Sequence, residues 1–436
     1  MKDTMPSRAS WQRPWVTVVI AVVVVLGAAA LALAVTSSED SGGRAGGGEG
    51  EQTARNVIFL MGDGMGASAR TLIRLATTGR DGDLVMNRLP YAGLVETDPD
   101  DGNESVTDSA AAATAFATGV RTFNGGVGVD AQARPVPTIL ERARDAGKAT
   151  GLVTTSQVTD ASPGAFAAHV ENRGQQTEVA HQYLEESRPD VILGGGEDHW
   201  LPPGNPGAYP DNPRKDPAEE SSSDRGDLIA RARELGYEYV SDRARLERSG
   251  AAKLLGLFAN EEMYEQRPEG KGDQYAPVVP LHEMTAKALS VLERDPEGFF
   301  LFVEEDGIDE FAHQNNARMT IRSGQALDRA VEVAVRFAAT HRDTLLVVAA
   351  DHATGGLAIE NVDPAGESRA GDSAEDGPFP IAGTDLEFLV DWSTDEHTGE
   401  STPVTADGPG AAALARVQKN TDVHDTIVAA MRLGDR

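Results

Sequence analysis

The sequence of 436 residues contains no cysteine. Disulfide bonds are therefore excluded, and no thiolate is available to bind a metal. Basic residues are also scarce, since Lys and Arg total 39 against 69 Asp and Glu, which gives a formal net charge of −30 at pH 7. Nucleic acids are bound through basic surfaces, so this balance argues against a nucleic-acid partner. Any bound metal must be held by His, Asp and Glu side chains and by hydroxyl oxygens.

One long apolar run stands near the start of the chain, from Trp15 to Val35. It is long enough to cross a bilayer as a helix, and the preceding residues 1–14 carry basic side chains that favour a cytoplasmic tail. Small residues near the end of the run also allow cleavage as a signal segment. Residues 36–52, rich in Ser, Gly and Glu, predict a flexible linker. We therefore expect an exported body, preferably anchored at the extracellular face of the cell membrane, or secreted if the segment is cleaved.

Residues 53–436 alternate between apolar strands and helical stretches. The run Val57–Met61 is typical of a buried parallel strand. Further strands are expected at 150–154, 191–193, 299–303 and 344–349, and helices at 136–145, 177–186, 281–293, 322–339 and 423–433. This alternation predicts a three-layer α/β domain with a mainly parallel central sheet and helices on both faces. The polar residues 197–275 are predicted to be an insertion over one end of the sheet.

An Ala-rich stretch after Ser109 predicts a helix with no breaker before Gly119. Ser109 would then lie at the helix N-terminus, where free backbone N–H groups and the helix dipole favour an anion. A hydroxyl group at that place can serve as a nucleophile or as a phosphate ligand. Asp108 and Ser109 can equally form a structural N-cap, so this stretch alone leaves both interpretations open.

Three of the predicted strands are followed by side chains that bind metals. These are Asp63 after the first strand, Glu304 and Asp309 after the second, and Asp351 and His352 after the third. The carboxyl ends of parallel strands meet at one edge of a sheet, so we expect these groups to converge. Asp309 and His313 are four residues apart, so on a helical turn they can bind one ion together. Converging carboxylates repel one another without cations, which favours a multi-metal site.

These motifs resemble those of the alkaline phosphatase family, and they follow one another in the family's order from about Asn56 to the C-terminus. The matching segments are 62–64, the Asp-Ser-Ala-Ala of 108–111, the stretch 159–173, the Glu304, Asp309 and His313 spacing, 351–356 and 396–399. The resemblance implies that residues 53–436 are a catalytic domain of that fold. It also implies hydrolysis of small phosphate monoesters of many alcohols through a phosphoserine on Ser109, and a possible homodimer.

The resemblance further implies two zinc ions and one magnesium ion. Asp309, His313 and His397 would hold the first zinc, and Asp63, Asp351 and His352 the second. Asp63, Ser162 and Glu304 would hold magnesium, with Asp160 close to it. Imidazole-containing sets suit zinc, and an all-oxygen set suits magnesium. Arg173 would grip two phosphate oxygens through its planar guanidinium group.

Glu310 departs from the family pattern, because relatives often carry Lys, His or Trp at this position. Its carboxylate could repel phosphate, bind a further cation or tune the magnesium site, and the sequence does not choose among these. A sulfatase is disfavoured because the Pro and Arg that should follow the nucleophile are absent. Two alternatives stay open: a phosphodiesterase of the same superfamily, which Ser109 and Arg173 disfavour, and a catalytically silent metal- or phosphate-binding surface protein, which would not need Ser109.

Overall fold

The structure is a computed structural model that describes residues 53–210, 220–266, 273–362 and 374–434. Residues Glu51–Arg436 form one compact unit. The predicted basic tail, apolar anchor and linker, residues 1–52, lie outside the described residues. Within the described part of the chain, no helix combines the length and the apolar character needed to span a membrane.

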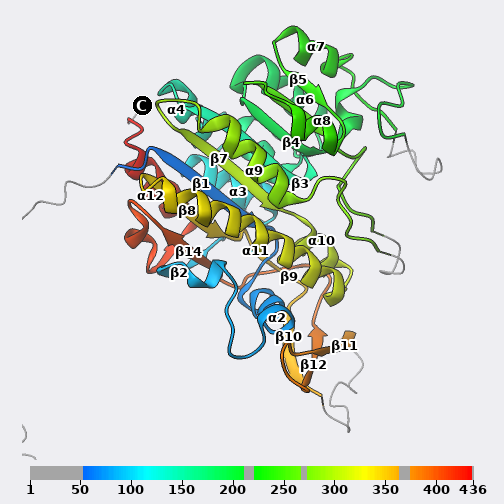
Figure 1. Ribbon diagram of the computed structural model, residues 1–436, viewed down its shortest axis with the longest axis vertical. Helices are drawn as coiled ribbons and strands as arrows, with labels where there is room; N and C mark the ends of the chain where they lie inside the picture. Colours follow the sequence, from blue (N-terminus) through cyan, green and yellow to red (C-terminus); the bar gives the residue numbers. More distant parts are fainter. Residues whose placement is uncertain (1–52, 211–219, 267–272, 363–373, 435–436) are drawn as a thin grey trace, which may run out of the picture. The chain divides into compact units, whose positions relative to one another are not determined.

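A ten-stranded sheet forms the centre of this unit, with the strand order β15-β2-β14-β8-β1-β7-β3-β4-β6-β5 (Figure 1). Its central strands are β8 (Thr344–Ala349), β1 (Asn56–Gly62), β7 (Phe299–Glu305), β3 (Ala149–Gln157) and β4 (Val191–Gly195). Toward one edge lie β14 (Thr402–Asp407), β2 (Tyr91–Glu96) and β15 (Val417–Lys419). Only β14 runs antiparallel to its neighbours in this sheet. The predicted mixed α/β fold with a mainly parallel sheet is confirmed.

Helices cover both faces of the sheet, because successive side chains of a strand point to opposite faces. In β1, Phe59 packs into one hydrophobic core and Leu60 into the other. The first core takes in α3 (Ser109–Thr118), α4 (Ile139–Asp145), α5 (Ala161–Ala167), α6 (Gln176–Gln182) and α12 (Asn420–Met431). The second takes in α2 (Ala67–Thr78), α9 (Leu281–Leu292) and α11 (Ala317–Thr340), of which α9 and α11 cross the near face in Figure 1.

The prediction that residues 197–275 are an insertion over the sheet is wrong in part, because two strands of this region belong to the sheet itself. Its described residues include α7 (Leu228–Glu234), β5 (Glu238–Val240), α8 (Arg243–Arg248) and β6 (Leu254–Leu257). Strand β6 pairs with β4 and β5 pairs with β6, so both extend the central sheet at one edge. The apolar run Leu254–Leu257 is short and stands in a polar stretch, which hid this strand from the sequence prediction.

Two smaller sheets lie beyond the end of β8. A three-stranded antiparallel sheet contains β10 (Leu357–Asn361), β12 (Glu387–Trp392) and β11 (Ala374–Pro380). A two-stranded sheet joins β9 (Ala353–Thr354) to β13 (His397–Thr398), with His397 opposite Thr354. This pairing carries His397 to the segment that follows β8. Since β1 lies between β7 and β8 and parallel to both, the residues after all three strands meet at one edge of the central sheet.

Candidate active site

Ser109 is the first residue of α3, and it does not share the helix-capping role of Asp108. The Asp108 carboxylate caps the helix, because it accepts hydrogen bonds from the backbone N–H groups of Ala111 and Gly125, each at 2.9 Å. The capping function is thus already filled. The Ser109 hydroxyl instead lies 3.3 Å from Nε2 of His352, and both residues are buried. The geometry therefore favours a chemical role for Ser109 over a purely structural one.

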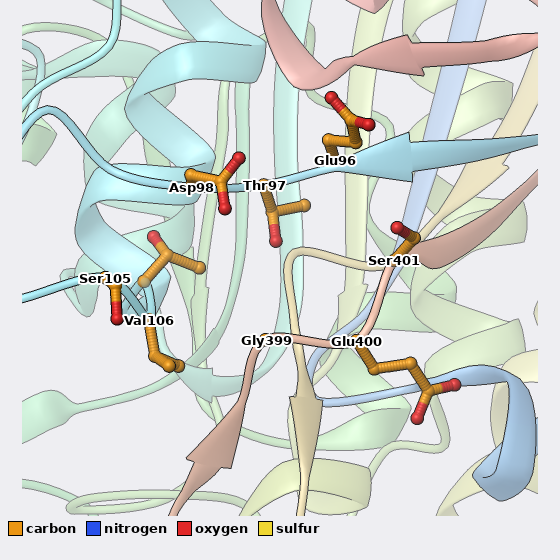
Figure 2. A pocket seen from close by; sticks show the side chains of 9 residues that line it. Glu96, Thr97, Asp98, Ser105, Val106, Gly399, Glu400 and Ser401 are labelled. Carbon is orange, nitrogen blue, oxygen red and sulfur yellow. The ribbon is translucent and has the colours of Figure 1, made fainter.

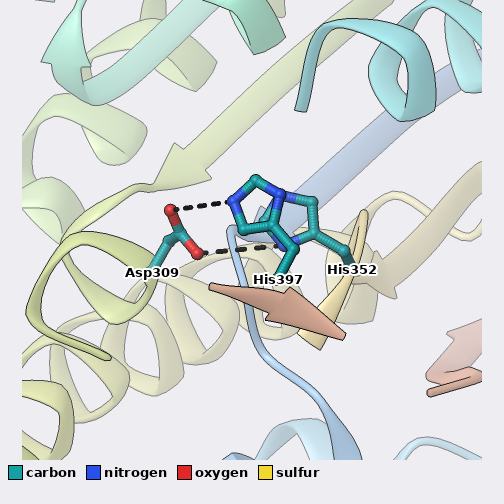
Figure 3. A group of neighbouring side chains, drawn as sticks. All are labelled: Asp309, His352 and His397. Atoms are coloured by element: carbon teal, nitrogen blue, oxygen red, sulfur yellow. Dashed lines mark ion pairs between the residues drawn. The ribbon is translucent and has the colours of Figure 1, made fainter. Parts of the chain in front are cut away.

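Figure 3 shows the imidazole rings of His352 and His397 stacked on each other, with the carboxylate of Asp309 beside both. Asp309 lies in α10 (Gly307–His313), and its Oδ1 and Oδ2 are each 3.8 Å from a nitrogen of His352 and His397 respectively. The two rings stack with centroids 3.7 Å apart. His313 joins them, since its Nε2 is 3.1 Å from Oδ2 of Asp309 and 3.1 Å from Nε2 of His397. Ligand atoms of Asp309, His352 and His397 thus lie within 4.8 Å of one another, with Nε2 of His313 next to two of them.

A second group contains Asp63, Asp351 and His352, whose ligand atoms all lie within 4.8 Å of one another. Nε2 of His352 is 3.4 Å from Oδ1 of Asp63 and 3.2 Å from Oδ2 of Asp351. Both of these oxygens are buried and have no hydrogen-bond partner. Burying unpartnered carboxylate oxygens is costly. A bound cation would satisfy them, so the donor set fits a metal.

The third group consists of oxygen ligands alone, namely the carboxylates of Asp63, Glu304 and Asp306. Ser162 lies in α5 and donates its hydroxyl hydrogen to Oδ2 of Asp63 over 3.4 Å. Thr154 donates to Glu304 at 2.6 Å. Oxygen ligands of this kind suit a hard cation such as Mg²⁺. His352 belongs to the first two groups and Asp63 to the last two, so the three groups form one continuous cluster.

The pKa values of these carboxyls show how little positive charge surrounds them. Burial, followed by repulsion from Asp351, raises the pKa of Asp63 well above its usual value. Burial raises the pKa of Glu304 to about 8 and that of Asp351 to about 6. Asp309 differs, because hydrogen bonds from His313 and His397 overcome the effect of burial and hold its pKa well below the usual value. Cations are needed for all of these carboxylates to be ionised together.

Arg173 faces the same edge of the sheet. Its backbone N–H donates to the carbonyl of Gly125 at 2.9 Å, and its guanidinium group donates to Asp108 at 3.4 Å and to Asp160 at 3.2 Å. Burial lowers the pKa of Arg173, but the charges of Asp160 and Asp108 outweigh this and raise it. The side chain is 34% exposed. A charged guanidinium group is thus held in place with room for an anion.

Glu310 lies beside Asp309 in α10, and its carboxylate is held by Gln266. The Gln266 side chain donates to Oε2 of Glu310 at 2.9 Å and to its backbone carbonyl at 2.7 Å. Burial, followed by the charge of Asp309, raises the pKa of Glu310. This carboxylate adds negative charge near the metal cluster.

A pocket of about 250 Å³ lies between the loop before α3 and the segment after β13 (Figure 2). The side chains of Glu96, Asp98 and Glu400 line it, and Oε1 of Glu400 accepts a hydrogen bond from the first backbone N–H of α2 at 2.8 Å. The pocket also reaches Thr107, whose carbonyl oxygen lies 3.0 Å from Nδ1 of His397. Because this wall is acidic, recognition of an anionic group falls to Arg173.

The structure brings together every residue that the sequence put forward for this site. Ser109 lies next to His352, Asp160 pairs with Arg173, and Glu310 lies beside Asp309. Six of the eight predicted ligands belong to the three groups, and the other two, His313 and Ser162, contact Asp309 and Asp63. Which ion each set binds stays a prediction. The sequence prediction missed Asp306 and Thr354, whose hydroxyl donates to Asp309. Asp306 is two residues after Glu304 at the end of a strand, so the two-residue period of strands could have placed both on one side.

Comparison with known proteins identifies the family. The model of the family "Alkaline phosphatase" matches residues 54–382. The chain belongs to the alkaline phosphatase family. It is 33% identical over 430 residues to alkaline phosphatase of Escherichia coli (strain K12), covering 88% of this chain and 87% of that protein. It is 36% identical over 432 residues to streptomycin-6-phosphate phosphatase of Streptomyces griseus, covering 88% of this chain and 92% of that protein.

The fold agrees with this family membership. The solved structure of alkaline phosphatase from the Antarctic bacterium TAB5 matches 88% of this chain and 100% of its own, with a TM-score of 0.71 and 27% identity. A mutant of that TAB5 enzyme was solved with Mg bound in a site called M3. The family is metal-dependent, and the chain is a phosphatase with metal-binding groups at the carboxyl ends of its central strands.

Proposed function

We propose that this protein hydrolyses phosphate monoesters through a phosphoserine intermediate on Ser109, with broad tolerance for the alcohol portion. The observation that carries the proposal is the place of the Ser109 hydroxyl. It lies at the N-terminus of α3, 3.3 Å from His352, which belongs to two of the metal-ligating groups. Family membership supports the reaction class.

We also propose that this cluster holds two zinc ions and one magnesium ion. The residues are Asp309, His313 and His397 for one zinc, Asp63, Asp351 and His352 for the other, and Asp63, Ser162 and Glu304 for magnesium. The imidazole nitrogens of the first two sets and the oxygen-only third set support this assignment. Cations bound there supply Lewis acidity, which favours the alkoxide form of Ser109 and stabilises charge on the phosphoryl oxygens.

The protein's own residues account for the rest of the reaction. Oγ of Ser109 attacks phosphorus, a new O–P bond forms, and the ester P–O bond breaks as the alcohol leaves and gains a proton. Water then cleaves the phosphoserine, which restores Ser109 and releases inorganic phosphate. Arg173 holds two oxygens of the phosphoryl group through paired N–H donors, and Asp108 and Asp160 fix its guanidinium group for this task. A diester has an ester group where Arg173 needs an oxygen, so monoesters are preferred.

The place of action is part of the proposal. The apolar run 15–35 would anchor the protein in the membrane with its catalytic domain on the extracellular face, or direct its secretion if cleaved. Fractionation of cells that express the full chain tests this, because recovery of the protein in the cytoplasm would contradict it. A homodimer is proposed by analogy with the family, and sedimentation that shows only monomer would contradict that.

Hydrolysis of p-nitrophenyl phosphate and of bis-p-nitrophenyl phosphate tests the reaction class. We expect the monoester to be the better substrate, and Ser109→Ala to lower its turnover by a factor of about 10³ or more. Ser290→Ala is the matched control, because Ser290 lies in α9, outside the site, and its hydroxyl donates to the backbone carbonyl of Lys287 at 2.8 Å; it should leave turnover unchanged. Preference for the diester would favour the phosphodiesterase alternative. Tight metal binding without turnover of either ester would favour the silent binding protein. Since one relative is named for streptomycin 6-phosphate, that ester belongs among the monoesters compared.

A further inference from the structure

We infer that Asp306 is a fourth protein ligand of the oxygen-only metal site, beside Asp63, Ser162 and Glu304. The proposed function leaves this residue without a role. Its carboxylate is only 4% exposed, and it offers a ligand atom within 4.8 Å of those of Asp63 and Glu304. The inference rests on the metal site proposed above, but not on the hydrolysis reaction.

The position of Asp306 follows from the strand that precedes it. Glu304 is near the end of β7, which stops at Glu305, and Asp306 is the N-cap residue of α10. This turn leaves a carboxylate oxygen of Glu304, one of Asp306 and one of Asp63 within 4.8 Å of one another. Two contacts hold Asp306 there. Its backbone N–H donates to the hydroxyl of Thr155 at 3.0 Å, and the hydroxyl of Tyr264 donates to its Oδ2. A carboxylate has about four acceptor positions, so this one hydrogen bond leaves Asp306 able to bind a cation.

Glu305, the residue between them, shows what a structurally satisfied carboxyl looks like at the same strand end. Its Oε1 accepts a hydrogen bond from Thr155 at 3.1 Å, and its Oε2 accepts one from Tyr275 at 2.6 Å. Both oxygens therefore have protein donors, and Glu305 belongs to none of the metal-ligating groups. Asp306 is as deeply buried but faces two further carboxylates instead.

Charge gives a second reason to assign Asp306 to the cation. Among the described residues, no lysine or arginine forms an ion pair with Asp63, Glu304 or Asp306; the nearby Arg173 pairs with Asp108 and Asp160. Three buried carboxylates within 4.8 Å of one another need a positive charge from elsewhere. A fourth oxygen ligand with a further negative charge makes the site bind a hard divalent cation more tightly and favours Mg²⁺ over softer metals.

The affinity of the site for Mg²⁺ tests the inference. Full-length protein with saturating Zn²⁺ is dialysed against graded Mg²⁺, and the bound metal is counted by mass spectrometry. Asp306→Asn keeps the shape of the side chain and removes its charge, so we expect the Mg²⁺ affinity of this site to fall about tenfold or more. Tyr264→Phe removes only the hydrogen bond to the Asp306 side chain and keeps the backbone contact with Thr155, so it should weaken Mg²⁺ binding about threefold. Glu305→Gln is the matched control and should leave Mg²⁺ binding unchanged.

Wild-type Mg²⁺ affinity in Asp306→Asn would overturn the inference. It would mean that Asp306 is a neutral carboxyl group that hydrogen-bonds to its neighbours and does not bind the metal. An equal loss in Glu305→Gln would overturn it too, since any buried carboxyl at this strand end would then have the same effect. If Asp306→Asn does not fold, unchanged Mg²⁺ affinity in Tyr264→Phe overturns the inference instead. Hydrolysis of p-nitrophenyl phosphate is measured in parallel. Absent hydrolysis with the expected loss of Mg²⁺ would refute the proposed function and leave the role of Asp306 standing.

Discussion

Two groups of charged side chains share one edge of the central sheet, and they differ in how their charges are balanced. Around Arg173, the protein supplies both signs, because the guanidinium group pairs with Asp108 and Asp160. In the cluster of Asp63 and Asp351, buried carboxylate oxygens have no hydrogen-bond partner. Two imidazole nitrogens of that cluster, from His313 and His397, also approach within 3.1 Å.

This difference indicates what each region needs. Around Arg173, side chains of the protein itself pair with one another, so the guanidinium group is held in position to bind an anion without a cofactor. The negative charges of the carboxylate and histidine cluster are balanced only when cations are bound. We therefore expect its metals to contribute both to the reaction and to the stability of the fold. A change in one of the two regions should therefore leave the other intact.

Removal of the metals should have the largest effect. After dialysis against a chelator, we expect loss of nearly all monoester hydrolysis and a decrease in unfolding free energy of about 4 kcal/mol, or roughly 10 °C in Tm. The physical reason is that the buried carboxylates then repel one another. Differential scanning calorimetry and turnover measure the two effects, and addition of Zn²⁺ with Mg²⁺ should reverse both. An unchanged Tm in the chelator would show that the cluster is balanced without cations.

Arg173→Ser should have the next largest effect, and it should fall on the anion rather than on the metals. Loss of two charge-assisted hydrogen bonds should lower kcat/KM for p-nitrophenyl phosphate by a factor of about 10²–10³. Hydrolysis of the diester and the metal content should change little. Arg134→Ser, which removes an exposed partner of Asp130, is the control. An equal loss for both esters would contradict the role given to Arg173.

Much of this site could be predicted from the sequence because strand ends and short motifs carry local information. Asp63, Glu304, Asp351 and His352 follow apolar runs, and parallel strands bring such positions together. The sequence could not show that Asp108 caps the helix while the Ser109 hydroxyl stays available. This depends on hydrogen bonds that Asp108 accepts from Ala111 and from Gly125, which lies later in the chain.

Other features depended on pairing between distant segments. Strand β14 is reversed, and β6 adds to the sheet edge from within a polar region, which no local pattern reveals. The sharing of His352 between two ligand groups depends on the contact of its segment with β13 and α10. Helix starts were shifted for a local reason: α4 begins at Ile139 rather than at 136 because Thr138 and Glu141 form a capping box.

Glu310→Gln should have a smaller effect, and it distinguishes the interpretations of this unusual carboxylate. Removing a negative charge beside Asp309 should lower KM for p-nitrophenyl phosphate about two- to fivefold, if Glu310 acts mainly by repelling phosphate. Gln266→Ala, which removes the donor to Glu310, should leave the charge and therefore KM nearly unchanged. A higher KM together with loss of metal from Glu310→Gln would instead assign Glu310 to cation binding.

The smallest effect is expected for an ion pair outside the site, in which His169 lies 3.2 Å from Glu141. Despite burial, the pair raises the pKa of His169 above 6.5 and lowers that of Glu141 below 4.5. Its stabilisation is lost as pH rises through the pKa of folded His169 or falls through that of folded Glu141, so it is fully present between pH 4.5 and 6.5. His169→Gln should cost about 1 kcal/mol more in urea unfolding near pH 6 than near pH 9. An equal cost at both pH values would contradict this.

Trapping of the phosphoryl group on the enzyme tests the central claim most directly, because it requires both regions at once. The metal-loaded full chain is mixed with p-nitrophenyl phosphate, quenched in acid and digested, and the peptides are analysed by mass spectrometry. We predict a phosphoryl group on the peptide that contains Ser109, and its absence after chelation. Continued turnover with no phosphopeptide, or with the phosphoryl group on another residue, would contradict the account.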